Sequence, residues 1–119
     1  MASFINTILK ADCIKAMRQF PAASVNFILT DPPYGIRYKS RDGRSIRNDD
    51  NLVWLRPAFA EMYRILADDN FCVSFYGWTF ADRFVTAFRN AGFRIVGHIT
   101  FQKDYVSSAG YMLSRHECA

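Results

Sequence analysis

A six-residue apolar run that ends in Asp-Pro-Pro-Tyr-Gly constrains the fold of this chain more than any other feature. Residues 25–30, Val-Asn-Phe-Ile-Leu-Thr, are apolar on both faces apart from the asparagine, which is typical of a central parallel strand buried on both sides. Two consecutive prolines follow, and they hold the backbone extended without offering amide protons. The run therefore predicts a buried strand that carries a carboxylate, two stiff residues and an aromatic ring at its carboxyl end.

Short apolar runs alternate with helical patterns along the rest of the chain. We expect strands at residues 4–9, 25–30, 71–76 and 93–101, and another that starts within residues 103–119. We expect helices at residues 12–20, 51–66 and 79–90, with Asp12 and Asn51 as N-terminal caps, a capping box at residues 79–82 and Gly92 as the last stop. This alternation predicts an α/β fold with a mostly parallel sheet flanked by helices.

The residues at the end of the first buried strand can bind an amine. A planar exocyclic amine can donate to the Asp31 carboxylate and to the Pro32 carbonyl, while its ring stacks on Tyr34 and Pro33 stiffens the turn. The carboxyl end of a strand is also where ligands bind in open α/β sheets. The alternative is structural: a strand ended by a Pro-Pro turn, with an aspartate that caps a neighbouring segment.

The Thr-Asp-Pro-Pro-Tyr-Gly sequence at residues 30–35 resembles the catalytic signature of amino-methyltransferases that modify the adenine or cytosine amine of DNA. Residues 9–14 and 24–27 are similar to that family's approach to this signature. The resemblance implies an incomplete Rossmann-like methyltransferase fold, S-adenosylmethionine as cofactor and DNA as partner. It implies catalytic roles for Asp31, Pro32, Pro33 and Tyr34, and it places Asp12 near the adenosine part of the cofactor, although a plain helix cap is the favoured role of Asp12.

The class that this chain most resembles has its catalytic half before its cofactor half. There, a glycine-rich Asp-Pro-Phe-x-Gly-x-Gly segment near the C-terminus cradles the cofactor, and residues 1–119 contain no such segment. We therefore expect a single partial catalytic domain that has little or no activity alone. The alternatives are a non-catalytic DNA-binding remnant, the catalytic half of a split enzyme whose cofactor-binding half is a separate chain, and a methyltransferase that acts on RNA or on a glutamine amide.

Residues 35–51 have no apolar period and are rich in Arg, Asp, Ser and Gly, which predicts a long mobile loop beside the strand end. Lys39, Arg41, Arg44 and Arg47 are candidates for contact with DNA phosphates, and a solvated loop is an equal alternative. Elsewhere, we expect His98 in the core, Trp78 as a secondary candidate for the base pocket, and residues 115–117 as a polar strand end that resembles a late family motif.

Composition limits the remaining possibilities. The net charge of +4 favours a polyanionic partner but is equally common in proteins that bind none. Three widely spaced cysteines indicate neither a disulfide framework nor a zinc site, and we expect no metal. No apolar run approaches the length of about 20 residues that spans a bilayer. These observations favour a cytoplasmic protein with reduced thiols and no membrane partner.

Overall fold

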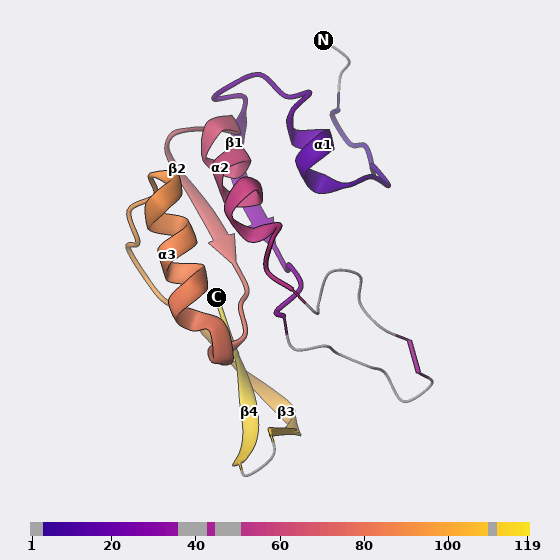
Figure 1. Cartoon of the computed structure of the whole chain (residues 1–119), viewed down its shortest axis with the longest axis vertical. Helices are drawn as coiled ribbons and strands as arrows, with labels where there is room; N and C mark the ends of the chain where they lie inside the picture. The colour runs from indigo at the N-terminus through magenta and orange to yellow at the C-terminus, as the bar shows by residue number, and fades with distance from the viewer. Residues whose placement is uncertain (1–3, 36–42, 45–50, 110–111) are drawn as a thin grey trace.

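A computed structural model describes residues 4–35, 43–44, 51–109 and 112–119, and for residues 107–109 and 112–114 it describes the backbone alone. Its centre is a strand-helix-strand unit (Figure 1). Strand β1 (Val25–Thr30) pairs in parallel with strand β2 (Leu66–Ser74), and helix α2 (Leu55–Ile65) connects them. The register runs from Phe27 opposite Phe71 to Thr30 opposite Ser74. The predicted strand at residues 25–30, its parallel pairing and the α/β class are confirmed.

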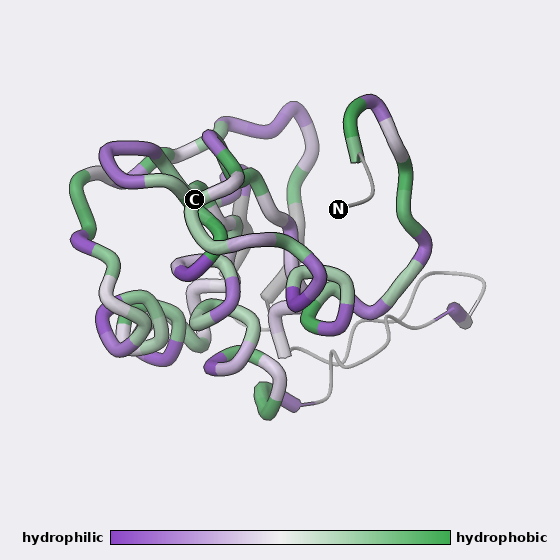
Figure 2. Tube along the Cα trace, turned by 90° about the horizontal axis from the view of Figure 1, so that it is seen from above, coloured by the Kyte–Doolittle hydropathy of each residue, from purple (hydrophilic) through white to green (hydrophobic). Residues whose placement is uncertain are grey.

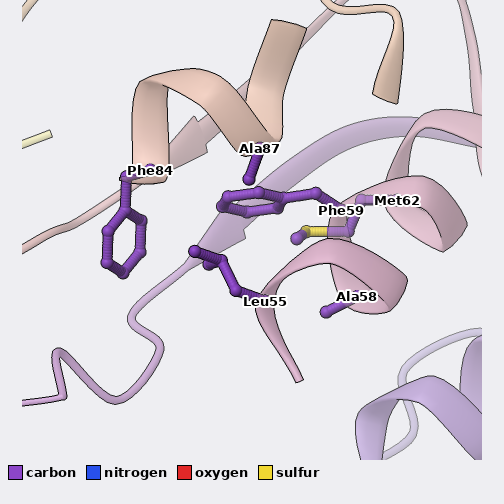
Figure 3. Packing of buried hydrophobic residues seen from close by; sticks show 6 residues of the cluster. All are labelled: Leu55, Ala58, Phe59, Met62, Phe84 and Ala87. Atoms are coloured by element: carbon purple, nitrogen blue, oxygen red, sulfur yellow. The ribbon is translucent and has the colours of Figure 1, made fainter. Parts of the chain in front are cut away.

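One helical layer covers one face of this strand pair. Helices α2 and α3 (Ala81–Ala91) pack together, and their buried side chains form the core: Leu55, Ala58, Phe59, Met62, Phe84 and Ala87 (Figure 3). The members from α2 recur at the three- and four-residue spacing of a helix face, as the sequence predicts. Ile28 of β1 and Cys72 of β2 are neighbours in register, and both pack against this cluster.

The opposite face of the strand pair is exposed. Phe27, Leu29 and Phe71 keep 55%, 62% and 64% of their surfaces accessible. The prediction that β1 is buried on both sides is therefore wrong for the described structure. The physical reason is that α2 and α3 lie on the same face, while helix α1 (Cys13–Met17) packs against α2 rather than beneath the sheet.

Residues 4–24 form one short helix and no strand. Residues 4–9, predicted as a strand, have no strand partner, and Ile8 is 97% exposed. Figure 2 shows this segment at the side of the molecule, and Phe4 stacks on the ring of Phe20 with 4.6 Å between the ring centroids. Helix α1 is shorter than the predicted 12–20, but its cap is confirmed because the Asp12 carboxylate accepts a 3.0 Å hydrogen bond from the Lys15 amide.

Helix ends elsewhere match the sequence in part. Gly92 ends α3 with a left-handed φ of 113°, as predicted. The capping box at residues 79–82 is wrong, because Thr79 lies inside the short 3₁₀ helix η1 (Trp78–Phe80) and the N-cap of α3 is Phe80, without a side-chain bond. Asn51 does not cap α2 directly; its side chain accepts from the Val53 amide, and Trp54 holds the cap position.

The C-terminal region forms an antiparallel hairpin of β3 (Thr100–Ala109) and β4 (Met112–Cys118). The predicted strand at residues 93–101 is wrong over most of its length, because residues 93–99 have no strand assignment and β3 begins at Thr100. The described strands thus form one parallel and one antiparallel pair, so parallel pairing holds for β1 and β2 alone. Within the described ranges, no helix has the length and apolar character needed to cross a bilayer.

Candidate functional site

The Asp31–Tyr34 turn lies where both parallel strands end. The amide of Phe75 donates to the carbonyl of Thr30 at 3.0 Å, so the pairing continues to the last residue of β1. Beyond this bond, the turn on β1 and residues 75–77 after β2 leave the sheet at the same edge. The carboxyl edge of parallel strands is the usual ligand-binding edge of α/β proteins.

The turn folds Tyr34 back onto Asp31. The Tyr34 hydroxyl donates a 2.9 Å hydrogen bond to Oδ1 of Asp31, which is solvent exposed, while Pro32, Pro33 and Tyr34 are half-buried. The carboxylate therefore does not point into the packed interior. An ionised carboxylate offers about four acceptor sites, and this bond uses one of them. Asp31 keeps acceptor capacity for a further donor.

Tyr34 stays a neutral hydrogen-bond donor. Burial is the largest cause that raises the pKa of its hydroxyl well above the ordinary value, and the hydrogen bond and negative charge of Asp31 raise it further. Glu117 and Cys118, at the end of β4, add smaller contributions in the same direction. The end of the hairpin therefore lies close enough to Tyr34 to act on it electrostatically.

Gly77 forms a wall of the site that sequence reasoning missed. A β-carbon added at Gly77 would lie 3.1 Å from Cβ of Tyr34 and 3.4 Å from two of its ring atoms. The backbone after β2 thus packs directly against the tyrosine. A glycine directly after an apolar strand and among aromatic residues is a signal of close backbone approach, and it could have identified this contact.

Gly35 closes the turn with a positive φ of 77°. A β-carbon there would meet Leu52 at 3.1 Å and Phe80 at 3.2 Å, so this glycine combines a left-handed backbone with tight packing. Trp78 begins the next segment with 68% of its surface exposed. It lies one residue after Gly77, so the turn, Gly77 and Trp78 occupy one region of the molecule.

The other predicted site residues are not brought to this turn by any described contact. Asp12 caps α1, and its cofactor role stays a prediction. Arg44 is exposed, whereas Lys39, Arg41 and Arg47 lie outside the described residues. His98 is exposed rather than in the core, which corrects that prediction, and its Nε2 pairs with the hydroxyl of Tyr76. In the part of the chain that the structure describes, His, Cys, Asp and Glu side chains form no metal-binding group of three or more.

Comparison with known proteins identifies the family. A family model of DNA methylases that modify N6 and N4 amines matches residues 25–119. A putative methylase of Escherichia coli K12, YubD, is 50% identical over 115 residues, which are 97% of this chain and 51% of that relative. The type II methyltransferase M.HinfI of Haemophilus influenzae is 33% identical over 70 residues, or 58% of this chain and 19% of that relative.

A third relative is the DNA adenine methyltransferase YhdJ of Escherichia coli K12, 37% identical over 62 residues, or 50% of this chain and 21% of that relative. The chain thus spans about half the length of the first relative and about a fifth of the other two. The family match includes β1, the Asp31–Tyr34 turn and all elements that follow. On this match, the chain belongs to the N6/N4 DNA methylase family, whose members are DNA methyltransferases.

Proposed function

We propose that the Asp31–Tyr34 turn binds the exocyclic amine of a DNA base in an S-adenosylmethionine-dependent methyltransferase, with adenine as the favoured base and cytosine as the alternative. The observation that carries the proposal is the exposed Asp31 carboxylate, held beside Tyr34 at the carboxyl ends of two parallel strands. Among the relatives, one is named as a DNA adenine methyltransferase, which supports adenine.

Each residue of the turn has a distinct part in this proposal. The amine donates one N–H to the Asp31 carboxylate and the other to the Pro32 carbonyl, so both of its donors are used and its nitrogen is held in place. Asp31 also stabilises positive charge as it develops on that nitrogen. Pro33 keeps the turn stiff, because its ring fixes the backbone.

Tyr34 supplies a stacking surface. Gly77 packs against Cβ and the nearest ring atoms of Tyr34. The tyrosine is therefore supported from the β2 side and stays only half-buried. Stacking of a base on an aromatic ring is worth about 1 to 3 kcal/mol, which is comparable to the cost of removing a base from a duplex. Tyr34 can thus offset much of that cost.

The described residues provide only part of a site for the methyl donor. When bound, S-adenosylmethionine supplies an electrophilic methyl group. The Asp12 carboxylate caps α1 through one hydrogen bond and keeps acceptor capacity, but no glycine-rich turn follows a described strand. We propose that residues 1–119 form a partial catalytic domain on an incomplete Rossmann-like fold, with residues 35–51 as a loop that contacts DNA. The cofactor cradle then belongs to residues outside this sequence, in the same protein or in a separate chain.

The amine interaction can be tested without the methyl donor. Chemical shifts of backbone amides are followed while deoxyadenosine or N6,N6-dimethyldeoxyadenosine is added, because the second nucleoside stacks but has no amine N–H. We expect shifts at Tyr34 and Gly77, with deoxyadenosine bound about tenfold more tightly than its dimethyl analogue, since hydrogen bonds to a charged group contribute about 1.5 to 3 kcal/mol and this one is exposed.

Two variants separate the roles of the carboxylate and the ring. Asp31→Ala should remove the preference for deoxyadenosine over its dimethyl analogue. Tyr34→Ala should weaken the binding of both nucleosides. Asp82→Ala on the exposed surface of α3 serves as the control and should change neither. Equal binding of the two nucleosides by the unmodified protein would refute the proposal, as would a preference that survives in Asp31→Ala. Titration with deoxycytidine shows which base is favoured.

A further inference from the structure

The α2–α3 groove, a cavity of about 580 Å³, lies between the beginning of α2 and helix α3. Leu55 and Ala87, which belong to the core, form part of its apolar lining. Among its described lining residues, Arg56, Asp82 and Arg83 are charged, and all three are exposed. Both helices begin at the edge where the parallel strands end (Figure 1). The groove therefore has an apolar base and a charged rim, and it lies at the edge of the sheet that carries the amine site.

The groove adjoins the amine site through close contacts. A β-carbon at Gly35, which closes the turn, would lie 3.1 Å from Leu52 and 3.2 Å from the ring of Phe80. Leu52 also lines the groove. The guanidinium of Arg83 lies over the same Phe80 ring, 5.3 Å from its centroid. One cation of the groove is thus separated from the end of the turn by a single aromatic ring.

The charge of the groove favours an anion. Two arginines, Arg56 and Arg83, oppose one carboxylate, Asp82, so the described lining has a net charge of +1. Within the described residues, neither guanidinium has a carboxylate partner, because the salt bridges there are formed by Arg64 and Lys103. The positive ends of both helix dipoles add to the positive potential. Guanidinium groups bind phosphate through two parallel hydrogen bonds, so a phosphate is the anion that this groove suits best.

A base that reaches the amine site brings the backbone of its own strand with it. Extrusion turns one nucleotide out of the duplex about this backbone, so the phosphates on both sides of the base stay attached to it and approach the protein. Half or more of the hydrogen bonds between proteins and DNA go to phosphate and sugar, and arginine is a frequent donor. A phosphate-binding site is therefore expected beside the turn, and the groove provides the cations for one.

We propose that the α2–α3 groove binds a phosphate of the DNA strand that carries the target base. Arg83 is the contact nearer to the turn, and Arg56 approaches from the α2 side. Thr86 and Asn90 line the groove farther along α3 and offer uncharged donors to the remaining phosphate oxygens. The volume lies within the range of about 300 to 1,000 Å³ that is typical of ligand sites, which leaves room for the sugar. The inference rests on the proposed function, because the strand reaches the groove from a base bound at the turn.

The test measures, by fluorescence anisotropy in a salt series, how the full chain binds a labelled single-stranded DNA pentamer with one adenine between two pairs of thymines. Arg83→Gln should weaken binding about fivefold and reduce the slope of log K against log salt concentration by about 0.7, the contribution of one phosphate contact. Arg56→Gln should act in the same direction. Asp82→Asn removes the opposing charge and should strengthen binding about twofold. Arg89→Gln, at an exposed position in the last turn of α3, is the matched control and should change neither quantity.

Deoxyadenosine has no phosphate and therefore separates this proposal from the proposed function. The Arg56 and Arg83 variants should bind deoxyadenosine as the unmodified chain does, because their amine site is intact. If deoxyadenosine binds to none of the proteins while pentamer binding still depends on Arg83, the amine site is wrong and the phosphate contact stands. Thermal melts show whether each variant is folded.

Three results would overturn the groove as a site for the DNA strand. The first is that the unmodified chain binds no pentamer at low salt. The second is that Arg83→Gln and Arg89→Gln bind the pentamer equally well. The third is that inorganic phosphate or polyglutamate, at the same concentration of negative charge, displaces the labelled pentamer as well as unlabelled pentamer does, which would assign the groove to free phosphate or to an acidic peptide.

Discussion

Replacement of Gly77 by alanine tests whether the backbone after β2 sets the position of Tyr34. The φ and ψ of Gly77 are −89° and 136°, which any residue adopts, so Gly77→Ala introduces no backbone strain. The added carbon would lie 3.1 Å from Cβ of Tyr34, whereas carbon atoms in contact prefer about 3.5 to 4.0 Å. Tyr34 must therefore move by about 0.4 Å or more.

The turn resists this movement at both ends. Pro32 and Pro33 fix the backbone before Tyr34, and its hydroxyl is bonded to Asp31 at 2.9 Å. Overpacking costs about 1 to 3 kcal/mol in a core, and this half-buried site belongs at the low end. Alanine recovers about 0.4 to 1 kcal/mol from the unfolded chain. We expect a net loss of about 0.5 kcal/mol in the free energy of unfolding, or about 2 °C in Tm, whereas a glycine replaced without a new contact should gain stability.

Gly97→Ala is the matched control, because a β-carbon at Gly97 has no atom within 4 Å and its φ is not in the left-handed region. This variant should melt at the same temperature as the unmodified chain or slightly higher. Denaturant midpoints and thermal melts of the two variants give the comparison, and nucleoside titrations show whether the displaced Tyr34 binds less tightly. Identical stabilities for Gly77→Ala and Gly97→Ala would refute the claim that close approach holds Tyr34.

Four further substitutions test the scaffold. Arg64→Met removes hydrogen bonds of 2.8 Å to the carbonyl of Met17, the last residue of α1, and of 2.9 Å to the carbonyl of Phe20. It should lower the free energy of unfolding by about 1 to 2 kcal/mol in urea titrations, whereas Arg89→Met at the end of α3 should have little effect. Asp12→Ala should lower the free energy of unfolding by about 1 kcal/mol, because it removes the cap of α1. Asp12→Asn keeps a capping side chain and should lose much less in the same assay. Gly92→Ala should lower Tm by several degrees, because φ is 113° and the new carbon would lie 2.8 Å from a tyrosine ring of α2. Folding raises the pKa of the Tyr34 hydroxyl, so the protonated hydroxyl stabilises the fold fully below about pH 10, and this stabilisation is lost as the pH rises. Between pH 9 and 11.5, the Tm of Tyr34→Phe should therefore fall less steeply than the Tm of the unmodified chain.

The elements that the sequence predicts best are those whose signals are local. The bounds of β1 match because its apolar run is bracketed by Ser24 and the two prolines. The apolar face of α2 matches because its spacing extends over three turns, although the helix begins at Leu55 rather than at residue 51. Helix α3 ends where Gly92 supplies a left-handed residue. In each case, the residues that decide the structure are neighbours in the chain.

Elements that depend on a distant partner are predicted poorly. Residues 93–99 have the composition of a strand, but a cavity lies between them and β2. Among these described residues, Ile99 pairs with Ala119, and the amide of Phe93 donates to Phe88 at the end of α3. The two-sided apolar pattern of β1 likewise predicts a cover for Phe27 and Leu29 that the described helices do not provide. Strand propensity reflects how well a side chain fits a half-buried surface. It therefore does not predict whether another element covers that surface.

The candidate site shows the same division. The chemistry of the turn follows from Asp31, two prolines and Tyr34 in sequence, and their mutual arrangement follows from the stiffness of the prolines. The support from Gly77 comes from more than forty residues away in the chain, and only the pairing of β1 with β2 brings the two segments together. The motif thus indicates what the site can bind, while the pairing of the strands determines how firmly Tyr34 is held in place.

The site and the hairpin meet at the end of β4. Cys118 pairs with Tyr76, and Glu117 and Cys118 act electrostatically on Tyr34. Gly77, the residue directly after Tyr76, packs against Tyr34, so the bridge to β4 and the support of the tyrosine lie on neighbouring residues of one segment. A substitution that frees the end of β4 is therefore expected to loosen the turn as well, because packing and charge both reach Tyr34 through this region.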